Sequence, residues 1–515
     1  MRIYTKAVIE GMTAFPDSDA ALVTAGLTGQ PVSDGTVENA KQKLLALYRA
    51  KGFLYTTVRA TVAGTELRFT VTEGYVAEVK LDGEIGPAAT QVLRFLNHLV
   101  GKKPLSVPDL ERWLLLSQDI PGLTVRTVLN PSSTDPGALT LVAQVSRKWF
   151  SGLAMADNRA FYLAGPEEAL AVLNFDSFTE YGERTQLSLF RTFGGTSAFG
   201  QAMEEFYLGG SGLKFRMYGG AGVVTPSGQL AQTGYDGNTR TVGVQLSYPL
   251  IRARAEQINL FAGFDGLEND VYNNLGANGN KTRTSYDSLR VVRLGGEYAS
   301  RDTLLEGLLG PGHEGLNGFS ARYSQGLEIL GASKNGDTTT PPPRLGEKIN
   351  FSKVSGELSR TQRLFVPYDD GSVSFRTALA WQYTTDLLPP TQKFYLGGPT
   401  FNRGYYFGQL SGDQGVSFAA ELRLDTPVPS PVRLPFEMKA QYYGFYDWGK
   451  VWQQTSKEAD VAVQSAGIGV RLFVTEATEI DLEGVYRLNR YPGGQGPGIS
   501  ALNTAAFYWQ ILQRF

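Results

Sequence analysis

The stretch that decides the fold is Phe394-Tyr-Leu-Gly-Gly-Pro-Thr-Phe-Asn-Arg403-Gly-Tyr-Tyr-Phe-Gly408, a glycine-rich segment that displays one arginine among aromatic residues. On its own it would be an ordinary loop. The residues on either side of it indicate its role, because residues 373–383 and 416–425 alternate between mainly apolar and mainly polar or small side chains. Such alternation is typical of a β-strand with one apolar and one polar face. We therefore expect the segment to connect two long strands.

This alternation continues through most of the chain after residue 148 and favours a transmembrane barrel over a soluble sandwich. A sandwich also alternates, but these strands are roughly ten residues long, as a tilted bilayer crossing requires. Their polar faces carry both charges, as with Glu421 and Arg423, which fits a wet lumen. At about 23 residues for a strand and its loop, the part of the chain after residue 148 is long enough for about 16 strands. The polar insert Ser333–Lys348 is expected to be an exposed loop.

Bulk composition excludes several classes of protein. The chain has 515 residues with 60 Gly, 25 Tyr and no Cys, so strands and turns are favoured, and disulfides and thiolate metal sites are excluded. No run approaches the roughly 18 apolar residues of a transmembrane helix. The net charge of −2 argues against nucleic acid as a partner. The start, Met1-Arg-Ile-Tyr-Thr-Lys-Ala-Val, lacks a signal-peptide pattern. If the protein is exported, we expect its numbering to begin after a removed signal or at a trimmed start.

The part before residue 149 reads as two copies of one unit, each a strand, two helices and two strands. In the first copy apolar residues recur at helical spacing, at Val37, Ala40, Leu44, Leu47 and Tyr48. Gly52 supplies the stop signal of that helix. The other expected elements are Ile3–Gly11, Leu54–Ala63, Glu66–Thr72, Tyr75–Leu81, Ala88–Val100, Val107–Ser117, Leu123–Leu129 and Ala138–Ser146. We therefore expect a first module at 1–74, a second module at 75–148 and a barrel at 149–515.

Three short motifs, one in each part of the chain, carry a family resemblance. They are Tyr48-Arg-Ala-Lys-Gly-Phe53, then Glu111-Arg-Trp-Leu-Leu-Leu-Ser-Gln-Asp-Ile-Pro-Gly-Leu-Thr-Val125 with Leu129-Asn-Pro131 and Gly137, and Arg403-Gly-Tyr405. Together they resemble the transporters of bacterial two-partner secretion, the haemolysin and filamentous-haemagglutinin exporters within the outer-membrane barrel assembly superfamily. The resemblance implies a mainly β protein, with a C-terminal antiparallel transmembrane β-barrel of about 16 strands preceded by two small α/β POTRA-like domains.

The resemblance also implies a candidate site inside the barrel. The family's sixth extracellular loop, here around residues 386–413, folds back into the pore. Its tip, Asn402-Arg403-Gly404-Tyr405, differs from the family at Asn402, where Val is usual. The implied partner of the arginine is Asp447 in Phe445-Tyr-Asp447-Trp-Gly449. Alternation along Phe436–Trp448 independently places Phe445 and Asp447 on the lumen face.

The implied function is export of a partner protein across the bacterial outer membrane, with the POTRA-like domains in the periplasm. The implied partners are a secreted adhesin, cytolysin or toxin, outer-membrane lipid, and the barrel assembly machinery through the C-terminal strand ending at Phe515. An unfolded partner would add a strand to a module edge, and candidate capture residues are Arg112, Val125 and Arg126. No catalytic residue, metal ligand or cofactor site is expected. The alternatives are a barrel-assembly insertase, a passive pore or an outer-membrane enzyme.

Overall fold

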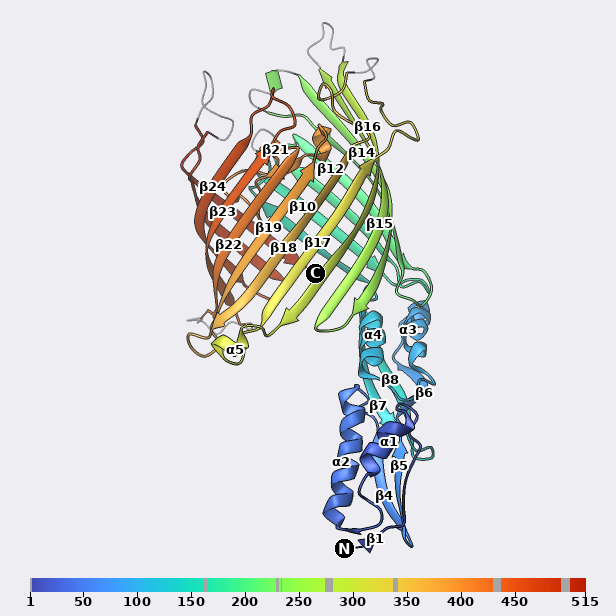
Figure 1. Cartoon of the computed structure of the whole chain (residues 1–515). Helices are drawn as coiled ribbons and strands as arrows, with labels where there is room; N and C mark the ends of the chain where they lie inside the picture. Colours follow the sequence, from blue (N-terminus) through green and yellow to red (C-terminus); the bar gives the residue numbers. More distant parts are fainter. Residues whose placement is uncertain are drawn as a thin grey trace.

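The computed structural model describes residues 2–161, 165–227, 231–232, 234–273, 281–336, 341–428, 437–491 and 501–515. Two small α/β modules form an arm that extends from one end of a large barrel (Figure 1). Within the described ranges, no helix is long and apolar enough to cross a membrane.

The first module is a three-stranded sheet with the order β2-β5-β4, in which β2 and β5 are parallel and β4 and β5 are antiparallel. Its elements are β1 (Arg2–Ile3), β2 (Lys6–Glu10), α1 (Asp17–Thr24), β3 (Pro31–Val32), α2 (Asp34–Ala50), β4 (Thr57–Ala63) and β5 (Glu66–Thr72). The expected strand Ile3–Gly11 is thus interrupted, because β1 pairs with β3 instead of continuing into β2.

Both ends of helix α2 follow from local side-chain and backbone chemistry. The Ser33 hydroxyl accepts a hydrogen bond from the backbone N–H of Thr36 at 3.1 Å and so caps the start of the helix. Gly52 has φ +83°, a conformation that glycine adopts without strain. The stop signal predicted at Gly52 is confirmed.

The carboxylate of Glu73, directly after β5, is the most fully satisfied buried acid of the first module. Its Oε1 accepts the backbone N–H of Thr13 at 2.8 Å, that of Ala14 at 3.1 Å and the hydroxyl of Tyr48 at 2.6 Å. The Thr13 hydroxyl donates to the other oxygen. Burial by itself would raise the pKa of Glu73, but these hydrogen bonds outweigh burial and lower it.

We expect Glu73→Ala to lower the free energy of unfolding of the first module by about 3 kcal/mol, because several buried donors lose their acceptor. With the folded pKa of the carboxyl below its ordinary 4.5, the stabilisation is present above that value and is lost as the pH falls through the folded pKa. Hydrogen exchange of the arm at neutral and acid pH measures both effects. Glu66→Gln, at a partly exposed position of β5, is the control and should leave the exchange rates unchanged.

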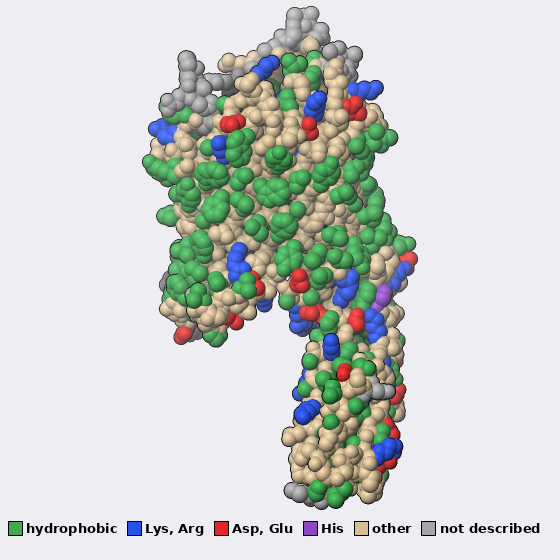
Figure 2. Space-filling model, in the orientation of Figure 1, with side chains coloured by type: hydrophobic (Ala, Val, Ile, Leu, Met, Phe, Trp, Pro, Cys, Tyr) green, Lys and Arg blue, Asp and Glu red, His purple; other side chains and the backbone are tan. Residues whose placement is uncertain are grey.

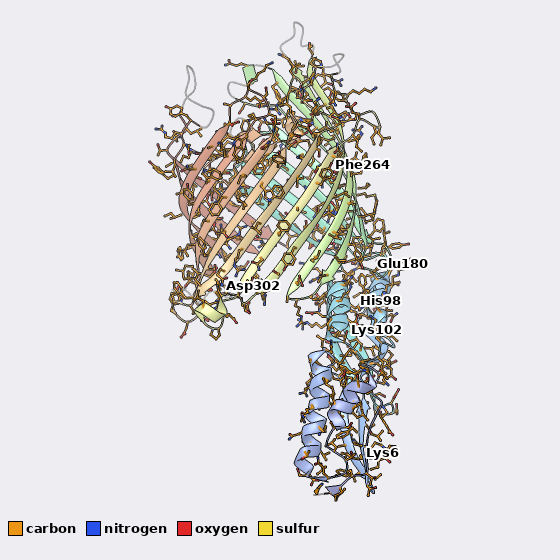
Figure 3. All side chains as sticks on the ribbon, in the orientation of Figure 1. Lys6, His98, Lys102, Glu180, Phe264 and Asp302 are labelled. Atoms are coloured by element: carbon orange, nitrogen blue, oxygen red, sulfur yellow. The ribbon has the colours of Figure 1, made fainter. Side chains whose placement is uncertain are left out.

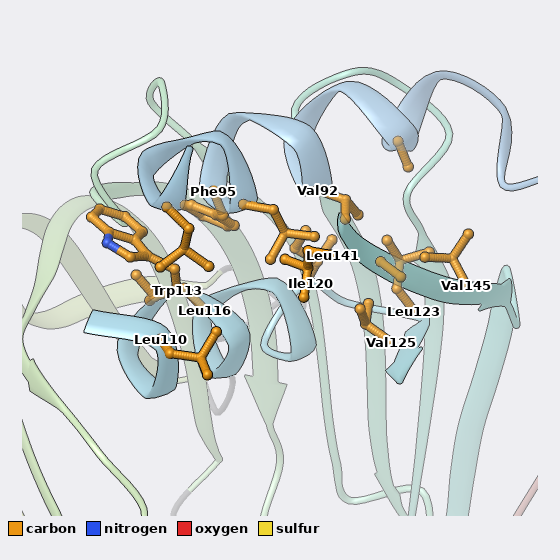
Figure 4. Packing of buried hydrophobic residues seen from close by; sticks show 14 of the residues in the cluster. Val92, Phe95, Leu110, Trp113, Leu116, Ile120, Leu123, Val125, Leu141 and Val145 are labelled. Atoms are coloured by element: carbon orange, nitrogen blue, oxygen red, sulfur yellow. The ribbon is translucent and has the colours of Figure 1, made fainter. Parts of the chain in front are cut away.

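The second module has the same plan, a sheet with the order β6-β8-β7 covered by two helices. Its elements are β6 (Tyr75–Asp82), η1 (Gly86–Ala88), α3 (Ala89–Leu96), η2 (Asn97–Leu99), α4 (Val107–Gln118), β7 (Leu123–Pro131) and β8 (Ala138–Arg147). Figure 4 shows Phe95 and Trp113 from the two helices and Leu141 from the sheet in one apolar core. The helix expected at Ala88–Val100 is shorter, because its ends tighten into 3₁₀ turns.

The core of the second module also contains a residue of the barrel. Tyr207, at the end of β12, is 1% exposed and belongs to this apolar cluster. Its ring meets that of Phe95 edge-on, with 5.1 Å between centroids. The arm and the barrel therefore share part of one core.

The barrel is a closed sheet of 16 antiparallel strands, as predicted. The strands are β9 (Phe150–Asp157), β10 (Glu168–Asp176), β11 (Arg184–Thr192), β12 (Ser197–Tyr207), β13 (Lys214–Val224), β14 (Tyr235–Arg252), β15 (Glu256–Asn273), β16 (Thr282–Asp302), β17 (Gly315–Gly326), β18 (Ser352–Phe365), β19 (Ser372–Thr384), β22 (Gln414–Pro427), β23 (Lys439–Trp452), β24 (Val461–Phe473), β25 (Thr478–Arg487) and β26 (Ala505–Arg514). A short helix, α5 (Glu306–Leu309), lies in the connection between β16 and β17. The barrel closes where β26 pairs with β9 over residues 510–514.

The two faces of the barrel wall differ as the alternation predicts. On β23, Tyr442 and Tyr446 are 51% and 40% exposed, whereas Tyr443 and Asp447, on the other face of the strand, are buried. Figure 2 shows a broad apolar band across the visible face of the barrel, with charged residues above and below it. Such a band fits the hydrocarbon layer of a membrane.

The insert Ser333–Lys348 only partly fits the expectation of an exposed loop. Leu345 is 81% exposed, but Glu347 is buried and the side chain of Arg344 is 10% exposed. The reason is charge pairing, because Arg344 binds Asp413 at the base of another loop. Residues 337–340, which include part of the Thr-Pro run, lie outside the described residues.

Candidate functional site

The connection between β19 and β22 folds back against the barrel wall. It contains the turn η6 (Pro390–Gln392) and a two-stranded hairpin of β20 (Phe394–Leu396) and β21 (Leu410–Gly412). Buried Leu396 and Tyr405 of this connection pack against Val451 and Val463 of the wall strands β23 and β24. The segment predicted to fold inward, around residues 386–413, thus has its own small apolar core against the wall.

The tip arginine, Arg403, is 2% exposed and binds the wall through several charged contacts. Its Nε and Nη2 donate to the two carboxylate oxygens of Asp447 at 2.9 and 2.8 Å, and its backbone N–H donates to Asp447 Oδ2 at 2.8 Å. The guanidinium lies 3.5 Å from the ring centroid of Phe445, and Nη1 also donates to Glu421. Bidentate pairing of this kind fixes the orientation of the guanidinium as well as its position.

The carboxylate of Glu421 joins this pair to other charges of the lumen. Its second oxygen accepts Arg423 Nε at 2.7 Å and Arg471 Nη1 at 2.9 Å. Glu421 was assigned to the polar face of its strand from the sequence, but it was not identified as a partner of Arg403. Alternation gives the face of a strand, whereas the pairing of strands β22 and β23, which sets Glu421 opposite Phe445, is not readable from one sequence.

The tip residue Asn402 has a left-handed backbone conformation. Its φ is +53°, a region in which asparagine is enriched and a β-branched residue is strained. Its side-chain oxygen accepts the Ser417 hydroxyl at 2.8 Å. Its amide also lies against Gly449 of β23, where an added Cβ would come within 2.5 Å of Asn402 Oδ1. Because glycine at 449 has no Cβ, the tip of the inward loop has room beside β23.

We expect Gly449→Ala to push the tip away from the wall and to reduce export. A Cβ at 2.5 Å from the Asn402 oxygen requires one of the two to move, and overpacking of this kind costs about 1–3 kcal/mol. Gly444→Ala on the same strand is a matched control, because a Cβ there meets nothing closer than 4.0 Å. Export assays on the two variants test this; equal export by both would contradict the role assigned to Gly449.

The rest of the tip is held by strands β24 to β26. The backbone N–H of Gly404 donates to Ser465 Oγ at 3.2 Å, and its carbonyl accepts from Arg487 Nε. The Tyr405 hydroxyl donates to the main-chain carbonyls of Gln464 and Asn489 at 3.1 and 2.7 Å. All four predicted tip residues therefore contact the wall.

Two further residues, Arg159 and Tyr508, contact the tip from the barrel closure and were not found from the sequence. Arg159, which follows β9, donates to the backbone carbonyl of Arg403 at 3.3 Å and pairs with Glu483 at 2.5 Å. It also lies over the ring of Tyr508 on β26, at 4.2 Å from the centroid. The first and last barrel strands meet only in the closed fold, so no local sequence signal could have brought Arg159 to Arg403.

The predicted capture residues lie in three different environments. Val125 is 3% exposed and belongs to the core of the second module. The guanidinium of Arg112 donates to the carbonyls of Pro249 and Leu250 at 2.9 and 3.1 Å, so it is bound to the barrel. These positions give a physical reason against capture by either residue, whereas Arg126 lies on β7 and is exposed.

Each of the two histidines lies within hydrogen-bond distance of a nearby main-chain carbonyl. His98 stacks on Trp113 at 3.8 Å between centroids, and its Nδ1 lies 2.8 Å from the carbonyl oxygen of Arg94. It lies with Glu180 where the arm meets the barrel (Figure 3). His313 Nδ1 lies 2.6 Å from the carbonyl oxygen of Gly310. In the described part of the chain, no group of three or more His, Asp and Glu residues is arranged to hold a metal ion.

Comparison with known proteins agrees with this architecture. The family model of the haemolysin secretion/activation proteins ShlB/FhaC/HecB matches residues 139–472. The heme/hemopexin transporter protein HuxB of Haemophilus influenzae is 21% identical over 467 residues, which are 88% of this chain and 78% of HuxB.

Solved structures share the fold. CdiB from Escherichia coli aligns with a TM-score of 0.75 at 17% identity, over 100% of this chain and 90% of CdiB. CdiB from Acinetobacter baumannii gives 0.67 at 15% identity with the same coverage. BamA from Haemophilus ducreyi lacking POTRA domains 1–3 gives 0.54 at 13% identity, over 100% of both chains.

The matched family segment covers more than half of the chain and includes both the inward loop and its acidic partners on β22 and β23. The closed barrel with its apolar band implies the outer membrane as the location. The chain therefore belongs to the ShlB/FhaC/HecB family of haemolysin secretion/activation proteins, the outer-membrane transporters of two-partner secretion.

Proposed function

We propose that this transporter takes up an unfolded partner protein in the periplasm with its two POTRA-like modules, 1–74 and 75–148. It then threads the partner through the barrel, 149–515, to the cell surface. The observation that carries this proposal is the charged attachment of the Arg403 tip to Asp447 and Glu421 inside the barrel. A loop held by hydrogen bonds and ion pairs, with no covalent link, can leave the lumen and return.

Capture by strand addition is supported by the sheet of the second module. Strand β7 is an edge strand in the order β6-β8-β7, and an extended peptide can pair with such an edge through main-chain hydrogen bonds. Arg126 and Val128 are exposed on this strand. Side chains of both kinds would favour a partner segment that presents an apolar residue near an acidic one.

The partner is proposed to be a secreted adhesin, cytolysin or toxin, and the name of HuxB adds heme- or hemopexin-related cargo as a class to test. No catalytic activity or cofactor is proposed. The final strand, which closes the barrel with β9 and ends at Phe515, is proposed to be the segment that the barrel assembly machinery recognises.

The proposal is tested by asking whether a neighbouring reading frame encodes a large exported protein, and by co-expressing that protein with this chain. We expect that protein to appear on the surface or in the medium only when this chain is present. Export unchanged by deletion of this chain would favour a barrel-assembly insertase or a passive pore instead.

A further inference from the structure

A second attachment of the inward loop lies at its base, at the end of the barrel away from the modules. Three connections meet there, between β17 and β18, between β19 and β22, and between β23 and β24. The residue at their centre is Asp413, between β21 and β22, which is 0% exposed. We call Asp413 and the groups that bind it the base cluster.

Each carboxylate oxygen of Asp413 accepts hydrogen bonds from two of the three connections. Oδ1 accepts Arg344 Nη1 at 2.7 Å and the backbone N–H of Leu388 at 2.8 Å. Oδ2 accepts Arg344 Nη2 at 3.2 Å and the backbone N–H of Gln454 at 2.8 Å. The start of the inward loop, its end and two neighbouring connections are therefore joined through one carboxylate.

Arg344 is the member of the base cluster that reaches in from the polar insert. Besides Asp413, it donates to the carbonyl of Leu388 at 2.6 Å and, through Nε, to Glu458 at 2.8 Å. Glu458 in turn accepts from Lys393 of the inward loop at 2.8 Å. The guanidinium thus contacts both ends of the inward loop and links it to the connection that carries Glu458.

The base cluster differs from the tip attachment in what it binds. The tip is held by side chains of barrel strands, such as Asp447 on β23, whereas the base is held by connections outside the strands. The two contact sets share no residue. The inward loop is therefore attached by two separate sets of contacts, one at its tip and one at its base.

We propose that Arg344 is a positioning residue that fastens the inward loop at its base, and that the pore opens only when this contact and the tip contact are both released. The proposal rests on the proposed export function for its biological meaning. The gating itself does not, because ion flow through the purified barrel reports on it without any partner protein.

Loss of Arg344 should leave the barrel folded. Asp413 keeps the backbone N–H groups of Leu388 and Gln454 as donors, so each of its carboxylate oxygens still accepts a hydrogen bond. Replacement of Asp413 should destabilise the loop more than replacement of Arg344 does. The carboxylate is the shared acceptor of two main-chain N–H groups and of the Arg344 guanidinium, and all three donors would lose it.

The test is the ion conductance of the full chain in planar bilayers. We expect Arg344→Ala to open about tenfold more often than the parent, since a hydrogen-bonded charge pair is lost. Lys348→Ala removes a cation from an exposed position of the same loop and should behave like the parent. Equal opening by the two alanine variants would overturn the proposal.

Two double variants separate the base from the tip. Arg344→Ala with Asp413→Ala should open no more often than Asp413→Ala alone, because both changes break one contact. Arg344→Ala with Arg403→Ala should open more often than either single variant. If Arg344→Ala adds nothing to Arg403→Ala, the base is not a separate attachment and the proposal fails. If Asp413→Ala does not insert, Asp413→Asn, which keeps one acceptor oxygen but loses the charge pair with Arg344, replaces it in the first pair with the same expectation.

A failure of the export function would look different. In that case the partner protein would reach the surface without this chain, while the opening frequencies of the Arg344 variants would still follow the pattern above. Conductance and export therefore report on the two proposals separately.

Discussion

Export is expected to fall at least about tenfold in the Arg403→Ala variant, with the barrel still inserted in the outer membrane. Arg403 is 2% exposed, and its removal leaves Asp447 and Glu421 without their shared cation. Breaking a buried ion pair on one side costs about 3–5 kcal/mol, more than the about 1.4 kcal/mol that changes an equilibrium tenfold. The pore should therefore open more often but the tip should no longer return to the lumen, and the proposed export depends on that return. The main-chain hydrogen bonds of the barrel are untouched, so insertion should persist. Export is measured by the appearance of the partner protein on the cell surface, and barrel insertion by heat-modifiable migration of this chain.

The controls for this variant come from the same lumen. Arg403→Lys keeps the charge but loses the planar fork that binds Asp447 through two oxygens, so export should be intermediate. Arg376 is a lumen-facing arginine of β19 whose side chain makes no hydrogen bond or ion pair with any other described residue. Arg376→Ala should export normally. Normal export by Arg403→Ala would remove the tip from the mechanism.

Much of the fold was predictable because it depends on local periodicity. The lumen position of Asp447 followed from the alternation along one strand, and its side chain lies on the buried face at 0% exposure. The strand count followed from spacing and is confirmed. Strands β14, β15 and β16 are much longer than the predicted ten residues, at 18, 18 and 21.

Contacts between distant segments were not predictable. Arg344 reads as part of a solvated insert because its neighbours are polar, yet it binds a residue of another loop. Arg112 reads as an exposed charge on a helix, yet its partners are main-chain carbonyls of the barrel. In both cases the deciding partner is an acceptor brought close by tertiary packing, which no spacing in the sequence encodes.

Several such tertiary contacts hold the second module against the barrel. Asp119, at the end of α4, forms a bidentate pair with Arg252 of the barrel, with both distances 2.7 Å. Arg94 of α3 pairs with Glu180 of a barrel turn at 2.8 Å. Tyr207 lies among these pairs, and its hydroxyl donates to the carbonyl of Asp119 at 3.2 Å. The apolar contact is thus surrounded by charged ones, an arrangement that excludes water from the tyrosine ring.

Tyr207→Ala is therefore expected to loosen the arm and to reduce export strongly. Removal of a large, fully buried aromatic side chain costs about 3–5 kcal/mol, and here the loss falls on the only described barrel side chain in the core of the second module. Tyr207→Phe is the matched control, because it keeps the ring contact with Phe95 and loses one hydrogen bond worth about 1 kcal/mol. Limited proteolysis of the arm and export of the partner protein measure the effect. Equal protease resistance and equal export in both variants would show that the shared core does not couple the arm to the barrel.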